Sequence, residues 1–180
     1  SEILIGWLQL GIVVIFGALY ALSPKMAPDV AGLQPAPLAL LAYVLFTLAR
    51  IASAYRGRLP RWLVALSAVA DIALLLGLIW SFHIQYGQPP SFYLKIPTLL
   101  YVFIFISLRA LRFDALYLIV AGVAGAAGWA GMVGYAVLTD DGGMMVTRDY
   151  VYYMTNNAIL IGAEFDKIVS ILMVTAVLAI

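Results

Sequence analysis

The chain contains no cysteine and a single histidine, His83. The lack of cysteine excludes disulfides, thiolate metal sites, iron–sulfur clusters and cysteine nucleophiles. With one histidine, a haem held by two histidines of this chain and a zinc site built from several histidines are excluded as well. The sequence therefore predicts no cofactor and no metal within these 180 residues.

Charge is scarce, because only 11% of the residues are charged whereas 65% are hydrophobic. A soluble domain carries about 25% charged residues. The apolar excess is larger than a core of this size could bury in water, so it predicts a second apolar solvent, a lipid bilayer. The formal net charge is +1 and there is no basic or acidic tail. Membrane lipids are therefore expected partners and nucleic acid is not.

The hydrophobic runs predict an all-α fold, a polytopic membrane bundle of six transmembrane helices that forms one domain over residues 1–180. Each run has about the 20 residues that a helix needs to cross a bilayer. The expected spans cover residues 3–22, 37–55, 61–82, 92–111 and 113–138, with a sixth that begins between residues 148 and 158. In the fourth span, Pro97 either kinks the helix or marks its true start.

The links between these spans alternate in character. Those after the second and fourth spans are short and rich in arginine, "YRGRLPRW" and "RALRFD", whereas the other three are longer and hold Pro, Gly, Asp and Tyr. The positive-inside rule places the arginine-rich links in the cytoplasm, and six spans then place both termini there too. The residues that set this bias are Arg56, Arg58, Arg61, Arg109 and Arg112 on one side, and Lys25, Lys95 and Arg148 on the other.

Aromatic residues cluster near the expected ends of the spans. They are Trp62 on the arginine side, and Tyr86, Phe92, Tyr93, Tyr150, Tyr152 and Tyr153 on the other side. Amphipathic rings at these positions are typical of the aromatic belt of a membrane protein. The alternative is a ligand cage on the outer side.

Arg50 and Asp71 are ionisable residues that lie inside expected spans. Asp71 is ten residues into the third span, about 15 Å from its start and near the bilayer midplane. Such a residue costs about 3 kcal/mol or more and is a functional candidate. Arg50 lies ten residues before Pro60 and Asp71 eleven after it, which places both at similar depth in an antiparallel hairpin.

This register predicts an Arg50–Asp71 contact, or a shared polar network, as an intramembrane switch. The alternative is that Arg50 snorkels to the cytoplasmic interface while Asp71 bonds a neighbouring serine or a backbone carbonyl.

The head of the last apolar run, "GAEFDKIVSILMVTAVLAI", carries three charges. Glu164 and Lys167 are spaced i,i+3 and can pair on one helix face, while Asp166 lies elsewhere on the helical wheel. Asn157 falls on the same stripe as Glu164. These four residues are the candidates for sensing a signal or binding a ligand on the outer side.

Two starts for this span are possible. If it begins at Ala158, the charges are buried against the bundle, which would suit a ligand or ion site. If it begins near Phe165, they lie at the outer interface and the span continues beyond Ile180, since thirteen residues are too few to cross. The second start implies that the sequence is part of a longer chain.

The fifth span has small residues at every fourth position, namely Gly122, Ala126, Ala130 and Gly134. This pattern lets helices approach each other closely. The span is therefore expected at the centre of the bundle, packed against neighbours in the chain or across a homodimer.

The sequence contains no common nucleotide-binding or catalytic motif, since it has no Walker A loop, no G-x-S-x-G and no H-E-x-x-H. The loop "TDDGGMMVTRDYVYYMTNN" contains Asp140, Asp141 and Asp149, but these lack the alternating spacing of an EF-hand. The favoured interpretation is a turn at residues 142–143 followed by Thr147 capping a tyrosine-rich interfacial helix.

Three stretches, "SFHIQYGQPPSFYLKIPTLLYVFIFISLRALRFD", "MMVTRDYVYYMT" and "GAEFDKIVSIL", resemble the N-terminal six-helix membrane domain of bacterial class III adenylate/guanylate cyclases. The resemblance spans nearly the whole chain. It implies a bacterial inner membrane, and a sixth helix that leads into a dimeric cytosolic cyclase domain. The Mg²⁺ ligands and substrate-binding residues belong to that domain, so no catalytic residue is assigned here.

The expected function is therefore a membrane anchor and sensor of a receptor-type cyclase, which passes a signal through its sixth helix to a catalytic dimer. The alternative is an accessory scaffold subunit of a larger bioenergetic or photosynthetic membrane complex, with lipid, quinone or pigment-protein neighbours. A small transporter is disfavoured because intramembrane polar residues are few and no repeat or broken helix pair is evident.

Overall fold

The computed structural model describes residues 2–22, 35–57, 60–139 and 146–180 of the chain. Within these ranges it contains α-helices, one short 3₁₀-helix and no strand, which confirms the all-α fold class. The elements are α1 (Glu2–Leu22), α2 (Pro35–Arg56), α3 (Arg61–Gln85), α4 (Ser91–Leu94), η1 (Pro97–Leu99), α5 (Leu100–Ala110), α6 (Ala115–Leu138), α7 (Tyr150–Thr155) and α8 (Ile161–Ala179).

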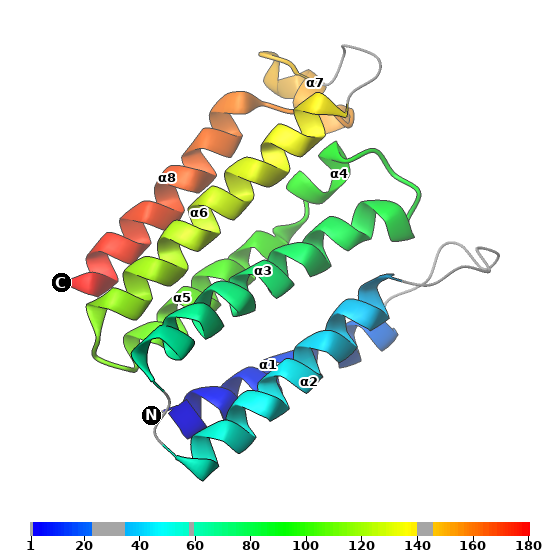
Figure 1. The fold of residues 1–180 in the computed structure, drawn as a ribbon. Helices are drawn as coiled ribbons and strands as arrows, with labels where there is room; N and C mark the ends of the chain where they lie inside the picture. Colours follow the sequence, from blue (N-terminus) through cyan, green and yellow to red (C-terminus); the bar gives the residue numbers. More distant parts are fainter. Residues whose placement is uncertain (1, 23–34, 58–59, 140–145) are drawn as a thin grey trace.

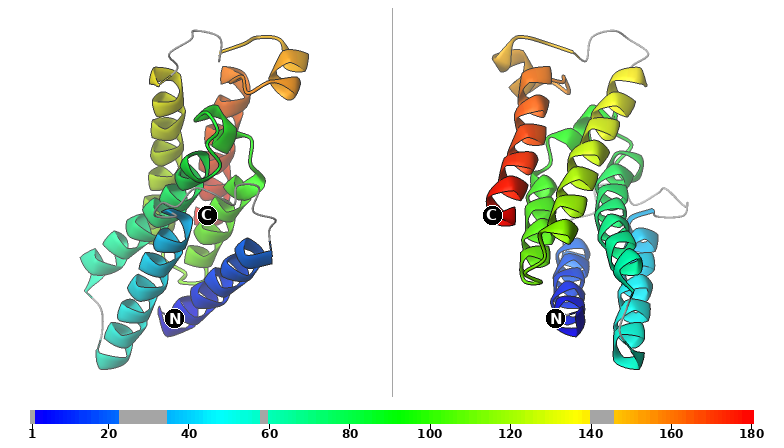
Figure 2. Two further views of the ribbon diagram at one scale, coloured as in Figure 1. Left: turned by 90° about the vertical axis from the view of Figure 1, so that its right-hand side faces the viewer. Right: turned by 60° about the vertical axis from the view of Figure 1, so that its left-hand side comes forward.

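The long helices lie side by side, and successive ones run in opposite directions (Figure 1). Helix α1 packs on α2, α2 on α3, α3 on α6, and α6 on α5 and α8, so α6 lies between several neighbours, as predicted for the fifth span. Figure 2 shows α4 and α7 near one end of the bundle. The end of α2, the start of α3 and the link from α5 to α6 lie at the opposite end.

The core lies where α3, α5 and α6 meet. Apolar side chains at helical spacing are buried there, including Ile72, Ile79, Val102, Ile106 and Trp129. The opposite faces of the same helices expose large apolar residues. Leu66 on α3 is 56% exposed and Leu116 on α6 is also 56% exposed. Leaving such side chains in water forfeits about 1.5–3 kcal/mol each, so these faces are compatible with a lipid environment.

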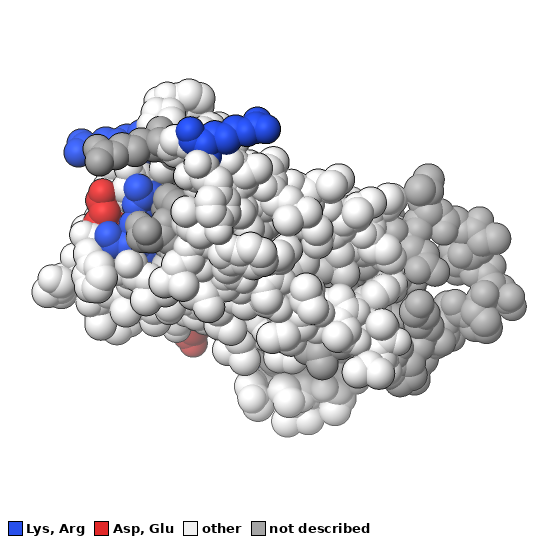
Figure 3. Space-filling view, turned by 90° about the horizontal axis from the view of Figure 1, so that it is seen from below, with Lys and Arg blue, Asp and Glu red and all other residues white. Residues whose placement is uncertain are grey.

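By length and composition, four of the described helices could cross a membrane, namely α1, α2, α3 and α6. The arrangement of charge agrees with this. Figure 3 shows one face on which most of the described charged side chains in view gather toward one side, with one acidic patch apart from them, while the rest of the described surface in this view is uncharged. Several long apolar helices in one chain are compatible with membrane insertion.

The helix predicted over residues 92–111 is not continuous. Helix α4 ends at Leu94, Ile96 is extended (φ −74°, ψ 137°), and η1 opens at Pro97 before α5 begins. Proline has no N–H to donate and biases the preceding residue away from helical geometry. Pro97 therefore marks the true start of this helix, which was one of the two predicted alternatives.

The segment before α8 also differs in detail from the prediction. Asp149, not Thr147, is the N-cap of the tyrosine-rich helix α7, because its carboxylate accepts from the backbone N–H groups of Val151 and Tyr152 at 2.8 and 3.2 Å. The Thr147 hydroxyl instead accepts from the backbone N–H of Asp149 at 3.0 Å. The predicted turn at residues 142–143, together with Asp140, Asp141, Lys25 and Arg58, lies outside the described residues.

The small residues of α6 divide into two groups. Gly122 and Ala126 are buried, and a Cβ atom added to Gly122 would overlap the side chain of Thr175 on α8. Ala130 is exposed, and a Cβ atom added to Gly134 would meet no atom of the described residues within 4 Å. The predicted close packing is therefore present within the chain for the first half of the stripe, whereas the second half makes no such contact here.

Candidate functional site

Arg50 and Asp71 form an ion pair between α2 and α3. The Nη1 atom of Arg50 donates to Oδ2 of Asp71 at 2.7 Å, and the two side chains are only 5% and 1% exposed. The contact predicted from the hairpin register is thus present. The alternative, in which Arg50 reaches the interface, is wrong for this structure because Arg50 is buried.

A second arginine shares the same carboxylate. Arg109 of α5 donates from Nη2 to Oδ2 of Asp71, and its side chain is 1% exposed. The sequence interpretation counted Arg109 with the short arginine-rich link after the fourth span and did not place it in this cluster, whereas in the structure it belongs to the last turn of α5 and is buried. Arg109 lies three and four residues after the buried Ile106 and Phe105 and therefore on the same buried face of α5.

Two neutral side chains complete the cluster. Gln9 of α1 donates from Nε2 to Oδ2 of Asp71 at 2.8 Å, and the Tyr43 hydroxyl of α2 donates to Oδ1 at 3.3 Å. Gln9 is fully buried and Tyr43 is 6% exposed. Side chains from α1, α2 and α5 thus converge on one carboxylate of α3, which we call the Asp71 cluster. Sequence reasoning missed Gln9 and Tyr43.

A second cluster lies at the other end of the bundle. Glu164 near the start of α8 is 1% exposed, and it accepts from Nζ of Lys167 at 2.7 Å and from the indole N–H of Trp129 at 3.0 Å. The predicted i,i+3 pair is therefore present, and its carboxylate faces the bundle. Trp129 of α6 was not predicted, and nothing in its sequence context distinguishes it from a core tryptophan.

Lys167 also bridges two elements. Its Nζ donates to the backbone carbonyl of Leu94 at 2.7 Å and lies 5.3 Å from the centre of the Trp129 ring. Leu94 ends α4, so this carbonyl belongs to the helix end left by the interruption at Pro97. The Glu164–Lys167–Trp129 group, which we call the α8 clamp, joins α8 to both α6 and α4.

Lys95, which follows α4, connects the end of that helix to the α7 segment. Its ammonium donates to the backbone carbonyls of Tyr153 and Asn156 and lies 4.5 Å from the centre of the Tyr153 ring. Burial, and secondly the charge of Lys167, lower the pKa of Lys95. Burial, followed by the charges of Glu164 and Tyr150, raises the pKa of Tyr153. Segments α4, α7 and α8 thus form one connected polar patch.

The other predicted signal-side residues are placed differently. Asp166 is exposed on α8, and Asn157 is exposed ahead of that helix, so neither faces the clamp. The backbone carbonyl of Asn157 accepts from the Ser91 hydroxyl at 2.6 Å. Tyr93, expected in the aromatic belt, is fully buried instead, and its hydroxyl donates to the carbonyl of Met132 at 2.6 Å.

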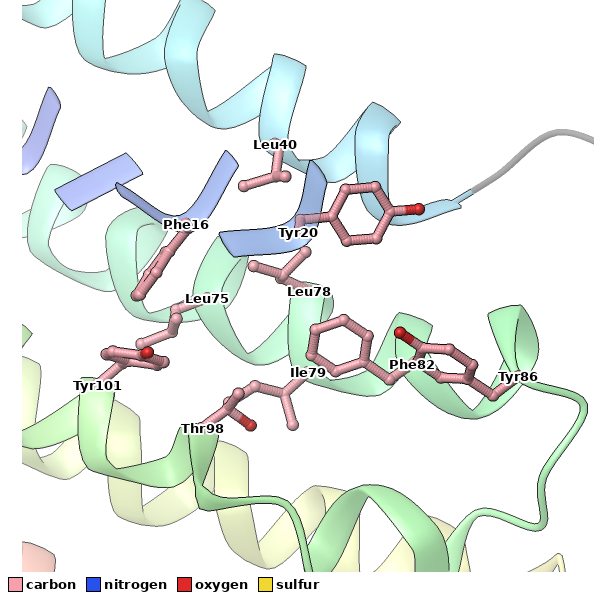
Figure 4. Close-up of a pocket in the computed structure, with 10 residues that line it drawn as sticks. All are labelled: Phe16, Tyr20, Leu40, Leu75, Leu78, Ile79, Phe82, Tyr86, Thr98 and Tyr101. Carbon is pink, nitrogen blue, oxygen red and sulfur yellow. The ribbon is translucent and has the colours of Figure 1, made fainter. Parts of the chain in front are cut away.

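An apolar cavity of about 180 Å³ lies between α1, α2, α3 and the start of α5. Figure 4 shows aromatic side chains around it, with Phe16 facing Tyr101, and Phe82 next to Tyr86. The amide of Gln85 donates to the Tyr20 hydroxyl of this lining at 2.5 Å. The complete lining is Phe16, Tyr20, Leu40, Leu75, Leu78, Ile79, Phe82, Tyr86, Thr98 and Tyr101, and none of these is charged. Such a lining suits an apolar group.

Comparison of the chain with protein-family models, with curated proteins and with solved structures finds no match in any of the three.

Proposed function

We propose that this chain is the membrane-embedded anchor and sensor domain of a receptor-type adenylate/guanylate cyclase. The support from sequence is the resemblance of three stretches to the membrane domain of bacterial class III cyclases. The support from geometry is the α8 clamp, through which the first turns of α8 are joined to α6 and α4. The clamp is the observation on which the proposal chiefly depends.

The proposal includes six crossings, with the arginine-rich links in the cytoplasm of a bacterial cell. Helices α1, α2, α3 and α6 would supply four of them. Helix α8 has 19 residues, or about 28 Å, which is close to the thickness of the hydrocarbon core. The apolar segment Pro97–Ala110 is shorter, so its crossing would rely on protein neighbours around the interruption at Pro97.

A signal would act at the end of the bundle that carries α4 and α7. A ligand or lipid that moves α7 would pull on Lys95, which is bonded to two carbonyls of the α7 segment. Lys95 immediately follows Leu94, whose carbonyl is held by Lys167 of α8. Displacement of α7 would therefore reach α8 through one short chain of contacts. A small shift of α8 would then be delivered to a catalytic dimer on the cytoplasmic side.

The test is cyclic nucleotide formation by the complete gene product in membranes. We expect Glu164→Gln and Lys167→Met to change the basal rate or its response to a signal at least several-fold. Asp166→Asn, which alters an exposed charge two residues away, should leave the rate unchanged. If Glu164→Gln and Lys167→Met also leave output unchanged in well-folded protein, transmission through the clamp is wrong. Absence of cyclase activity together with co-purification with a bioenergetic complex would instead support the scaffold alternative.

A further inference from the structure

The cavity of about 180 Å³ in Figure 4 separates α1 from α3 and α5. Two polar contacts between α1 and α3 flank it along the bundle, Gln9 with Asp71 on one side and Tyr20 with Gln85 on the other. The lining residues of α1 and α3 lie between these contacts in the chain or next to them. Atoms that line a cavity have no packing partner on that side, so an occupant would complete the packing of α1 on the rest of the bundle.

Size and charge limit what that occupant can be. A cavity of about 150 Å³ lined by aliphatic and aromatic side chains binds benzene, so about 180 Å³ holds a single six-membered ring with a small substituent. None of the lining residues that the structure describes is charged. A charged group would lose its hydration here without gaining a counter-charge. The cavity therefore suits a small neutral molecule.

Half of the residues that line the cavity are aromatic. Figure 4 shows their rings in two groups on either side of an aliphatic stretch of α3, with Phe16 and Tyr101 in one group and Tyr20, Phe82 and Tyr86 in the other. In the first group the two ring centres are 4.0 Å apart and the ring planes meet at 67°. Aromatic rings gain offset-stacked or edge-to-face contacts with one another in addition to the burial of apolar area. An aromatic ring therefore fits this lining better than a flexible hydrocarbon chain of the same size.

Two hydroxyl groups of the lining offer hydrogen bonds to such a ring. The hydroxyls of Tyr86 and Tyr101 make no hydrogen bond within the described part of the chain, and Figure 4 shows the Tyr86 side chain turned back toward Phe82. Both tyrosines are partly buried, and a buried tyrosine hydroxyl usually has a partner. The Thr98 hydroxyl oxygen, in contrast, is enclosed by the protein and out of reach of an occupant. An acceptor oxygen on the ring would therefore be recognised by Tyr86 or Tyr101.

We propose that this cavity binds a small neutral aromatic molecule that carries a hydrogen-bond acceptor oxygen, such as a carbonyl group on a single ring. The ring would lie between the two aromatic groups, and the oxygen would accept from the hydroxyl of Tyr86 or Tyr101. Apolar walls with a few polar groups that fix orientation are the usual composition of a small-molecule site. The site depends on the fold and not on the cyclase assignment, so its test measures binding and not cyclic nucleotide formation.

The test uses the chain purified in nonionic detergent, with probes of similar size. Acetophenone has the ring and the carbonyl, isopropenylbenzene replaces the carbonyl oxygen by a methylene, octan-2-one replaces the ring by a chain, and benzoate adds a charge. Equilibrium dialysis, with affinities referred to the probe concentration in protein-free micelles, should show saturable acetophenone binding and about fivefold or weaker binding of the other probes. Absence of saturable acetophenone binding would overturn the site. Equal or tighter binding of isopropenylbenzene, octan-2-one or benzoate would overturn the acceptor oxygen, the ring or the neutral charge, respectively.

Variants locate the site. Leu78→Trp should abolish saturable acetophenone binding because the larger side chain fills the cavity. Leu66→Trp on the same helix, at a position that is 56% exposed and outside this lining, should bind like the wild type. Replacing Tyr86 and Tyr101 together by phenylalanine should abolish the preference for acetophenone over isopropenylbenzene while keeping the ring contacts. Unchanged binding to Leu78→Trp, or an unchanged preference in the double variant, would overturn the proposal. If Leu78→Trp fails to fold, the double variant decides alone.

Discussion

Arg50 and Arg109 donate to one and the same atom, Oδ2 of Asp71, although they lie on different helices, α2 and α5. The carboxylate is 1% exposed, so it acts as the common partner of two buried cations. The side-chain amide of Gln9 on α1 donates a hydrogen bond to the same oxygen. The position of this single side chain thus connects α1 and α2 with the rest of the bundle.

Replacing Asp71 by asparagine should destabilise the fold strongly. The variant would remove the negative charge that Arg50 and Arg109 share, and breaking a buried ion pair in this way costs about 3–5 kcal/mol. Unfolding in mixed micelles measures the effect. Asp166→Asn, at an exposed position, is the control and should change stability by no more than about 0.5 kcal/mol.

The Arg50–Asp71 coupling can be measured by adding Arg50→Gln to Asp71→Asn. Because both residues belong to one hydrogen-bonded network, the double variant should be less destabilised than the sum of the two single variants. Simple additivity of the two free-energy changes would contradict the ion pair.

Trp129→Phe should weaken the α8 clamp. The change removes the indole N–H that donates to Glu164 but keeps most of the apolar ring, and a hydrogen bond to a charged group contributes about 1.5–3 kcal/mol. Trp62→Phe is the matched control, because Trp62 is 67% exposed, and it should change the free energy of unfolding by less than about 0.5 kcal/mol. Equal effects of the two substitutions would exclude the clamp as a stabilising contact.

Gly122→Ala should be destabilising, since the new Cβ atom would overlap Thr175 and push α8 away from α6. In Gly131→Ala on the same helix, the new Cβ atom would meet nothing within 4 Å in the part of the chain that the structure describes. It should be neutral or stabilising, because alanine favours a helix over glycine by up to about 1 kcal/mol. Opposite signs in a thermal unfolding experiment are expected, and a neutral Gly122→Ala would contradict the close packing of α6 on α8.

Lys95 should make stability depend on pH in the alkaline range. Its pKa is lowered in the folded protein by burial and by the charge of Lys167, so the unfolded chain binds more protons between the folded pKa and the ordinary value of 10.5. Stability therefore rises with pH in that window. The wild type should gain stability relative to Lys95→Met as the pH approaches 10.5. A constant difference between the two proteins would contradict the lowered pKa.

The sequence predicted contacts correctly where spacing along the chain determines which residues meet. In a hairpin of two antiparallel helices, for example, residues equally far from the turn lie at the same depth in the bundle. Arg50 and Asp71 flank Pro60 almost symmetrically, and their contact follows from that register. The pairing of Glu164 with Lys167 follows in the same way from local helix geometry. Both predictions depend on spacing alone, which a sequence displays directly.

Contacts between elements that are distant in the chain could not be derived in this way. Gln9 belongs to α1, which is separated from α2 by a long link, so no register places it near Asp71. The contact of Arg109 with Asp71 was not predicted, because the face and the start of α5 depend on how Pro97 interrupts the preceding helix. Trp129 reaches Glu164 only through the packing of α6 on α8, which a helical period cannot specify.

The side of the membrane reached by each end of the bundle is the most direct test of the proposed function. The chain contains no cysteine, so single-cysteine variants report one position each. Gly57→Cys after α2 and Asn157→Cys before α8 are both exposed positions at opposite ends of the bundle. We expect a membrane-impermeant maleimide to label Asn157→Cys in intact cells and Gly57→Cys only after lysis. Labelling of both positions from the same side would contradict the account.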